Sequence, residues 1–171
     1  MKPTFGQRLD VYTRNSLPVL VTLLLVLANV IPLHIPGLSR IVPILPLMAV
    51  YQWAVYRPNL MPPLAVFFIG LIYDILSGTP LGVNAFVFLA VYGVVIYQQR
   101  FFTGKSFGVV WLGFGIVALG ASILSWAMVS ILSASLVEPR AAIFQYLLNF
   151  GFFPLLAWLF LRWQNTLLKA E

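Results

Sequence analysis

The chain has 171 residues, of which 61% are hydrophobic and only 8% are charged. A soluble domain usually carries about a quarter charged residues, so a water-soluble fold of this length lacks the polar side chains to cover itself, whereas a lipid-facing surface needs none. The absence of cysteine excludes disulfides, thiolate metal sites and cysteine nucleophiles. The formal net charge of +6 comes from basic residues spread over the connecting segments, which indicates membrane topology rather than nucleic-acid binding.

Six apolar segments follow a polar stretch at the N-terminus, and a helix needs about 20 residues to cross a bilayer. Proline and glycine are frequent in the breaks between segments, where they end helices. The segments lack the alternating pattern of a membrane β-barrel. We therefore predict one transmembrane domain over residues 1–171, an all-α bundle of six transmembrane helices. The predicted spans are residues 17–35, 41–56, 60–76, 81–97, 107–132 and 141–161.

The distribution of basic residues predicts the orientation of these spans. With the N-terminus in the cytoplasm, eight basic residues face the cytoplasm and two face outward, as the positive-inside rule requires. Without the second span, four would lie inside and six outside. We therefore expect both termini in the cytoplasm, with Arg57, Arg100 and Lys105 on the cytoplasmic face. These cations would meet cytoplasmic partners or anionic lipid, and plain topological anchoring explains them equally well.

Asp74 is the one acidic residue inside a predicted span, near the end of the third. A charged carboxylate at a helix centre costs about 2.5–3.5 kcal/mol on insertion scales, so the side chain should face protein or water, or be protonated. One interpretation is that Asp74 binds a partner or holds the third and fourth spans together. The other is that it reaches water near the span end and merely caps the following turn.

Glycines surround this acidic residue. Gly70 and Gly78 lie four residues to either side of Asp74 and would share its helix face, where glycine lets a second backbone approach closely. Gly82 lies beyond the turn, and Asn84 is placed to hydrogen-bond across it.

The fifth span is rich in small residues, which favour tight helix packing. This face would meet another subunit or, more commonly, pack inside the same chain. The small residues are Gly113, Gly115, Ala118, Gly120, Ala121, Ser122 and Ser125.

The sequence carries no signature of catalysis or metal binding. The single histidine, His34, has no further ligand nearby. The segment Thr103-Gly104-Lys105-Ser106 lacks the glycine-rich run of a phosphate-binding loop. We expect no enzyme activity, no cofactor and no metal site.

Three segments carry a resemblance to a known family. They are the run from Pro46 to Pro58, the segment Gly70-Leu-Ile-Tyr-Asp-Ile-Leu-Ser-Gly-Thr-Pro-Leu-Gly-Val-Asn-Ala85, and the stretch from Tyr146 to Leu156. Together they resemble the rod shape-determining protein MreD family of bacteria.

The resemblance implies a non-catalytic scaffold in the bacterial inner membrane that belongs to the cell-elongation machinery and is needed for rod shape. The implied partners are the bitopic protein MreC, the actin-like MreB, and the glycosyltransferase and transpeptidase that build lateral peptidoglycan. We place the expected packing or partner contacts at Gly70, Asp74, Gly78, Pro80, Gly82 and Asn84.

An alternative function follows from a second likeness. The family is similar in architecture to the substrate-binding membrane subunits of vitamin uptake transporters, which suggests a small-molecule-binding subunit of an uptake transporter. Against this, few polar side chains lie within the spans to line a pocket. They are Asn29, Asp74, Asn84, Gln145 and Asn149.

Overall fold

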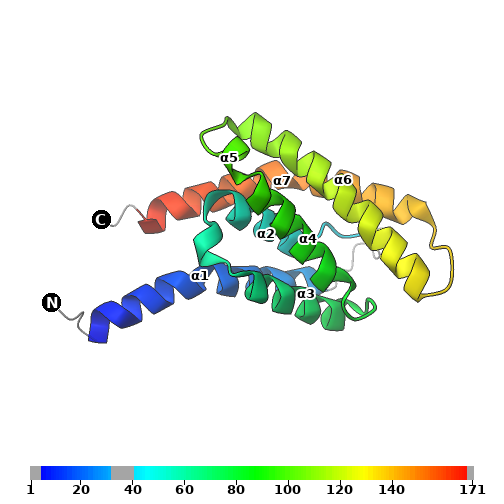
Figure 1. Cartoon of the computed structure of the whole chain (residues 1–171), viewed down its shortest axis with the longest axis horizontal. Helices are drawn as coiled ribbons and strands as arrows, with labels where there is room; N and C mark the ends of the chain where they lie inside the picture. The colour runs from blue at the N-terminus through cyan, green and yellow to red at the C-terminus, as the bar shows by residue number, and fades with distance from the viewer. Residues whose placement is uncertain (1–4, 32–40, 169–171) are drawn as a thin grey trace.

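The computed structural model describes residues 5–31 and 41–168, and every regular element within them is a helix (Figure 1). The prediction of an all-α fold is therefore confirmed for the described part of the chain. The elements are α1 (Phe5–Val30), α2 (Leu45–Tyr56), the short 3-10 helix η1 (Pro58–Leu60), α3 (Pro63–Ser77), α4 (Val83–Tyr97), α5 (Gln99–Phe102), α6 (Phe107–Leu132) and α7 (Pro139–Leu168).

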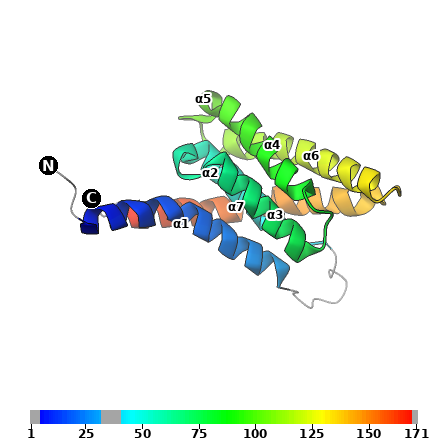
Figure 2. The same cartoon turned by 60° about the horizontal axis from the view of Figure 1, so that its bottom comes forward.

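The long helices run back and forth between two ends of the molecule (Figures 1 and 2). α1 begins and α7 ends at the left of Figure 1, and η1 and α5 lie on the same side of the bundle, nearer its middle. We call this the basic end, because Arg57, Arg100 and Lys105 are exposed there. The α3–α4 and α6–α7 connections lie at the opposite end, which we call the Asp74 end.

α2 lies at the centre of the bundle. Residues 46–55 are all buried, as expected for a helix that is apolar on every side. Tyr51 packs edge-on against rings from α5, α6 and α7. Its hydroxyl donates a hydrogen bond of 2.8 Å to the backbone carbonyl of Val110 in α6. α2 is therefore enclosed by its neighbours and has little contact with the surrounding solvent.

The outward faces of the surrounding helices are apolar. Leu64, Ile116 and Leu155 are 66%, 75% and 64% exposed, a pattern that soluble monomers avoid and that lipid permits. Among the described residues, α6 and residues 139–166 of α7 are long and apolar enough to cross a membrane. α3 and α4 have 15 residues each, a length of about 22 Å, which is shorter than a hydrocarbon core of about 30 Å.

The helix bounds differ from several predicted spans. α6 coincides with the predicted span 107–132, but α1 begins at Phe5, well before the predicted residue 17, because polar residues do not end a helix. α7 likewise continues to Leu168 rather than ending at residue 161. The end of the first predicted span and His34 lie outside the described residues.

Proline accounts for the remaining differences in bounds. α2 begins at Leu45 rather than at residue 41, because Pro43 disfavours helix in the residue before it, whereas Pro46 lies in the first turn, where proline is tolerated. α3 begins at Pro63 instead of residue 60, since proline suits the first helical position. α4 begins at Val83, two residues after the predicted start, and the short α5 was not predicted.

Residues 41–44 precede α2 and are not helical. Non-helical backbone at membrane depth must find its hydrogen bonds within the protein, and three amide side chains from α1 and α7 supply them here. The bonds run from Asn29 Nδ2 to the Pro43 carbonyl at 2.9 Å, from Gln145 Nε2 to the Val42 carbonyl at 3.1 Å, and from the Ile44 N–H to Asn149 Oδ1 at 2.7 Å.

Candidate functional site

Asp74 lies in the last turn of α3 and is completely buried. Its carboxylate accepts hydrogen bonds from five donors, which lie in the α3–α4 turn or in the first turn of α4. They are Thr79 Oγ1 at 2.7 Å, Asn84 Nδ2 at 2.8 Å, and the backbone N–H groups of Gly82 at 3.0 Å, Asn84 at 3.0 Å and Ala85 at 3.3 Å. The first N–H groups of a helix lack partners within it, so Asp74 caps α4 from the neighbouring helix.

Glycine residues determine the geometry of this cap at two places, the turn before α4 and the contact between α3 and α4. Gly82 is the residue before α4, and it has no side chain that could cap the helix. Gly78 and Gly82 adopt φ values of 72° and 95°, which glycine tolerates best. At Gly70, an added Cβ would lie only 2.4 Å from the Cα of Ala85. The missing side chain lets the α3 and α4 backbones touch, which brings Asp74 within reach of the start of α4.

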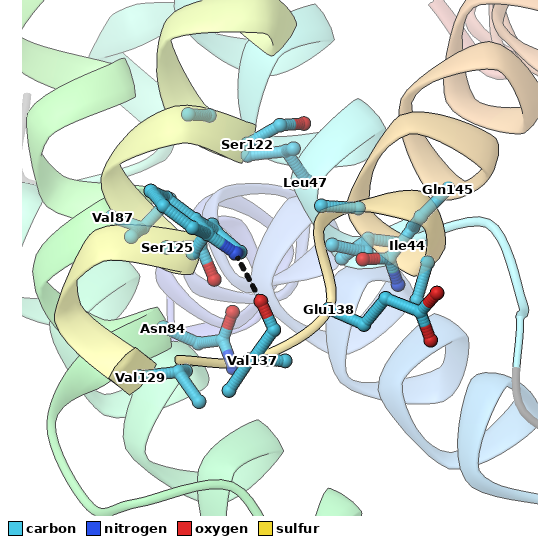
Figure 3. Close-up of a pocket in the computed structure, with 14 residues that line it drawn as sticks. Ile44, Leu47, Asn84, Val87, Ser122, Ser125, Val129, Val137, Glu138 and Gln145 are labelled. Atoms are coloured by element: carbon cyan, nitrogen blue, oxygen red, sulfur yellow. Dashed lines mark hydrogen bonds between the residues drawn. The ribbon is translucent and has the colours of Figure 1, made fainter. Parts of the chain in front are cut away.

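A pocket of about 160 Å³ opens at the Asp74 end, between α2, α4, α6 and α7 (Figure 3). Its polar lining residues are Asn84, Ser122, Ser125, Glu138 and Gln145, with Trp126 beside them. Trp126 Nε1 donates a hydrogen bond of 2.9 Å to the Val137 carbonyl, drawn as the dashed line in Figure 3. This bond holds the α6–α7 connection beside the pocket.

A family model for rod shape-determining protein MreD matches residues 11–164. This chain belongs to the rod shape-determining protein MreD family. The resemblance seen in the sequence is thereby confirmed, and the matched region contains both the Asp74 cap and the pocket. MreD proteins are membrane-associated, have a role in rod shape determination and are non-enzymatic, and the family is generally associated with MreC and MreB. No curated protein and no solved structure matches the chain.

The six residues at which packing or partner contact was predicted form one hairpin in this MreD-family chain. Asp74 and Asn84 bond to each other, Gly70 is where the two backbones touch, and the Pro80 carbonyl accepts from the Val83 N–H at 3.3 Å to close the turn. Asp74 is completely buried, so it does not reach water. Contact of this hairpin with a partner stays a prediction.

The three predicted cytoplasmic cations lie apart from this site, at the basic end. Arg57, Arg100 and Lys105 are all exposed, and the Lys105 Nζ lies 5.7 Å from the centroid of the Phe101 ring. Their assignment to the cytoplasmic face also stays a prediction.

The small residues of α6 other than Gly120, which is exposed and has nothing within 4 Å of an added Cβ, have two roles. Gly113 and Gly115 face the rings of Phe102 and Phe150 so closely that an added Cβ would collide with them, and Ala118 and Ala121 are buried, which is internal packing. Ser122 and Ser125 instead line the pocket. From the sequence, both serines were expected to pack inside the chain or against another subunit, and Glu138 was not singled out.

The polar residues within the spans are largely occupied with backbone groups. Asn29, Gln145 and Asn149 bond to residues 42–44, Asp74 caps α4, and the side chain of Asn84 donates to Asp74. The described part of the chain contains no group of three or more histidine or acidic residues that could hold a metal ion.

Proposed function

We propose that the protein is a non-catalytic scaffold of the bacterial cell-elongation complex, which builds lateral peptidoglycan. Membership of the MreD family is the observation that carries this proposal. The protein forms a single transmembrane domain in the inner membrane, crosses it six times and keeps both termini in the cytoplasm.

The arrangement of the helices supports six crossings. The chain passes between the basic end and the Asp74 end with α1, α2, α3, α4, α6 and α7 (Figures 1 and 2). α2 is short, but η1 and the extended residues 41–44 lengthen its passage. Because the passes alternate, α1 begins at the end where α7 finishes, as six crossings require.

Charge supports the orientation. Among the residues whose side chains are described, Arg57, Arg100, Lys105 and Arg162 are exposed toward the basic end. At the Asp74 end, Arg140 is offset by Glu138, whose Oε1 lies 3.4 Å from the arginine Nε. Basic residues of short loops stay in the cytoplasm, so the basic end faces the cytoplasm.

The surface chemistry suits a scaffold. The connections between helices are short, so partners must be met largely through the exposed apolar helix faces within the bilayer. The proposed partners are an MreC-like bitopic protein at these faces, MreB at the basic end, and the glycosyltransferase and transpeptidase of the same complex.

The pocket supports the alternative of a small-molecule-binding transport subunit less well. Sites for drug-sized ligands usually measure about 300–1,000 Å³, whereas this pocket measures about 160 Å³. The amide nitrogens of two lining residues also already donate hydrogen bonds within the protein, Asn84 to Asp74 and Gln145 to the Val42 carbonyl. The scaffold is therefore the better-supported function.

Depletion of the protein in its native cell tests the proposal. Cell width and rounding are scored while the tagged protein is purified from membranes and its companions are identified. We expect rods to become round and elongation proteins to co-purify. Cells that stay rod-shaped, or a protein that carries a metabolite and no membrane partner, would overturn the scaffold function.

A further inference from the structure

The Asp74 cap determines which atom Asn84 presents to the pocket. Asn84 is only 4% exposed, and its Nδ2 donates to Asp74 Oδ1 at 2.8 Å and to Thr79 Oγ1 at 3.1 Å. Both Asp74 oxygens already accept from backbone N–H groups, so a flipped amide would set oxygen against oxygen. Asn84 Oδ1 therefore faces away from the carboxylate, toward the pocket (Figure 3), and has no hydrogen-bond partner among the described residues.

Gln145 is oriented by the same reasoning. Its Nε2 donates to the backbone carbonyl of Val42 at 3.1 Å, and a carbonyl oxygen can only accept. The Gln145 amide nitrogen is thus turned to residues 41–44, and its Oε1 points to the pocket interior in Figure 3. No hydrogen bond within the described part of the chain involves this oxygen.

The rest of the polar lining favours the same kind of ligand. Ser122 and Ser125 carry hydroxyls able to accept, and neither has a partner within the described ranges. The indole N–H of Trp126 is engaged by Val137, so it is not free to donate to an anion. Glu138 adds a carboxylate at the mouth, paired with Arg140 across 3.4 Å with both side chains largely exposed. Such exposed ion pairs contribute little to stability, so another cation can replace the arginine beside Glu138.

The geometry points to a binding site for a cationic hydrogen-bond donor the size of an amino-acid side chain, a guanidinium or an alkylammonium group. The lining is rich in acceptors: two amide oxygens, two hydroxyls and one carboxylate. The two amide oxygens are oriented by the hydrogen bonds that the nitrogens of the same amides donate. Hydrogen bonds from a charged donor are stronger than those from a neutral one. Size limits the ligand, because about 160 Å³ is close to the engineered cavity of about 150 Å³ that holds a benzene ring.

This donor has two sources: a basic side chain on a protein partner at the outer surface, or a free small amine. The inference deepens the proposed function and rests on it for the biological source. The chemistry of the pocket is testable on the purified protein alone. Absence of cation binding would overturn the inference and leave the scaffold function unaffected. Normal cell shape after depletion would overturn the scaffold function and leave cation binding by the pocket unaffected.

The test uses the full-length protein in lipid nanodiscs, labelled with 5-fluorotryptophan. The five tryptophans give separate ¹⁹F signals, and Trp126→Phe identifies the one beside the pocket. We titrate n-propylguanidinium and, as its neutral counterpart of the same shape, n-propylurea. The cation should shift the Trp126 signal saturably and bind about tenfold more tightly than the urea, because its bonds are charge-assisted.

Two variants connect the binding to the pocket. Glu138 is exposed, so Glu138→Gln should fold normally and weaken cation binding several-fold. Arg162→Gln removes a charge near the opposite end and should leave binding unchanged. Equal affinity for the cation and the urea, equal effects of the two variants, or a shift shared by all five tryptophans would overturn the inference.

A second arm separates the two sources. The protein is extracted from native membranes and analysed by native mass spectrometry, and a photo-crosslinking amino acid is placed at Val129, which lines the pocket. A bound amine mass supports a free ligand, and a crosslink to a peptide that contains lysine or arginine supports a partner side chain. Absence of both overturns the inference.

Discussion

Replacing Gly70 with alanine would drive a methyl group into the backbone of α4. The new Cβ would lie 2.4 Å from the Cα and 2.7 Å from the N of Ala85, whereas nine in ten real Cβ contacts are at 3.4 Å or more. Backbone atoms cannot rotate aside as a side chain can, so α3 and α4 must separate by about 1 Å. The Ala85 N–H, now 3.3 Å from Asp74 Oδ2, would then pass beyond hydrogen-bond range.

Three terms set the size of the effect. Overpacking costs about 1–3 kcal/mol, and a lost hydrogen bond to a buried carboxylate costs about 1.5–3 kcal/mol. Alanine returns about 1 kcal/mol through its better helix propensity. We therefore expect Gly70→Ala to lower the free energy of unfolding by about 1.5–5 kcal/mol.

Gly93 offers a matched control. It also lies in the middle of a helix, α4, but it is exposed and has nothing within 4 Å of an added Cβ. Gly93→Ala should therefore leave stability unchanged or raise it by up to about 1 kcal/mol. Both variants are compared by unfolding the purified protein in mixed micelles with increasing SDS. If Gly70→Ala proves as stable as Gly93→Ala, the close approach of α3 and α4 is refuted.

Further predictions concern the cap, the extended segment and the orientation. Asp74→Leu should insert normally but leave the backbone N–H groups of Gly82, Asn84 and Ala85 without their acceptor, at about 1–3 kcal/mol each, and lose rod shape; unchanged cell width at normal expression would contradict this. Asn149→Leu should cost about 1–3 kcal/mol in SDS unfolding by orphaning a backbone N–H of the extended segment, whereas Asn165→Leu, exposed on the same helix, should stay within about 0.5 kcal/mol. A reporter after Glu171 should be cytoplasmic and one inserted after Ser135 should be outside; both in one compartment would refute the orientation.

The helices were predictable where local composition decides them. The bounds of α6 follow from an apolar run with a charged residue just before it and a polar segment after it. The start of α2 was not predictable from hydropathy, because the prolines near residue 45 interrupt an apolar run that hydropathy treats as continuous. The hydrogen bonds that stabilise this interruption come from Asn29, Gln145 and Asn149, and partners so distant in sequence leave no local signal.

The candidate site was predictable in position but not in geometry. Asp74 could be singled out from the sequence, because placing a carboxylate within an apolar span costs free energy. Whether it is buried or reaches water depends on how closely α3 approaches α4, which the contact at Gly70 decides. The pocket could not be predicted, since Ser122, Ser125 and Gln145 meet Asn84 only through the packing of three helices.

The dependence of residues 41–44 on α7 has a consequence for biogenesis. A ribosome makes α2 early, but the amides of Gln145 and Asn149 lie 103 and 105 residues further along the chain than their backbone partners. Until the last helix emerges, these backbone groups can be satisfied only by water or lipid headgroups at the membrane surface. The nascent protein therefore cannot complete the hydrogen bonds of residues 41–44 until α7 has been made, and a chain cut short before α7 would present this unfinished segment to the proteases of membrane quality control.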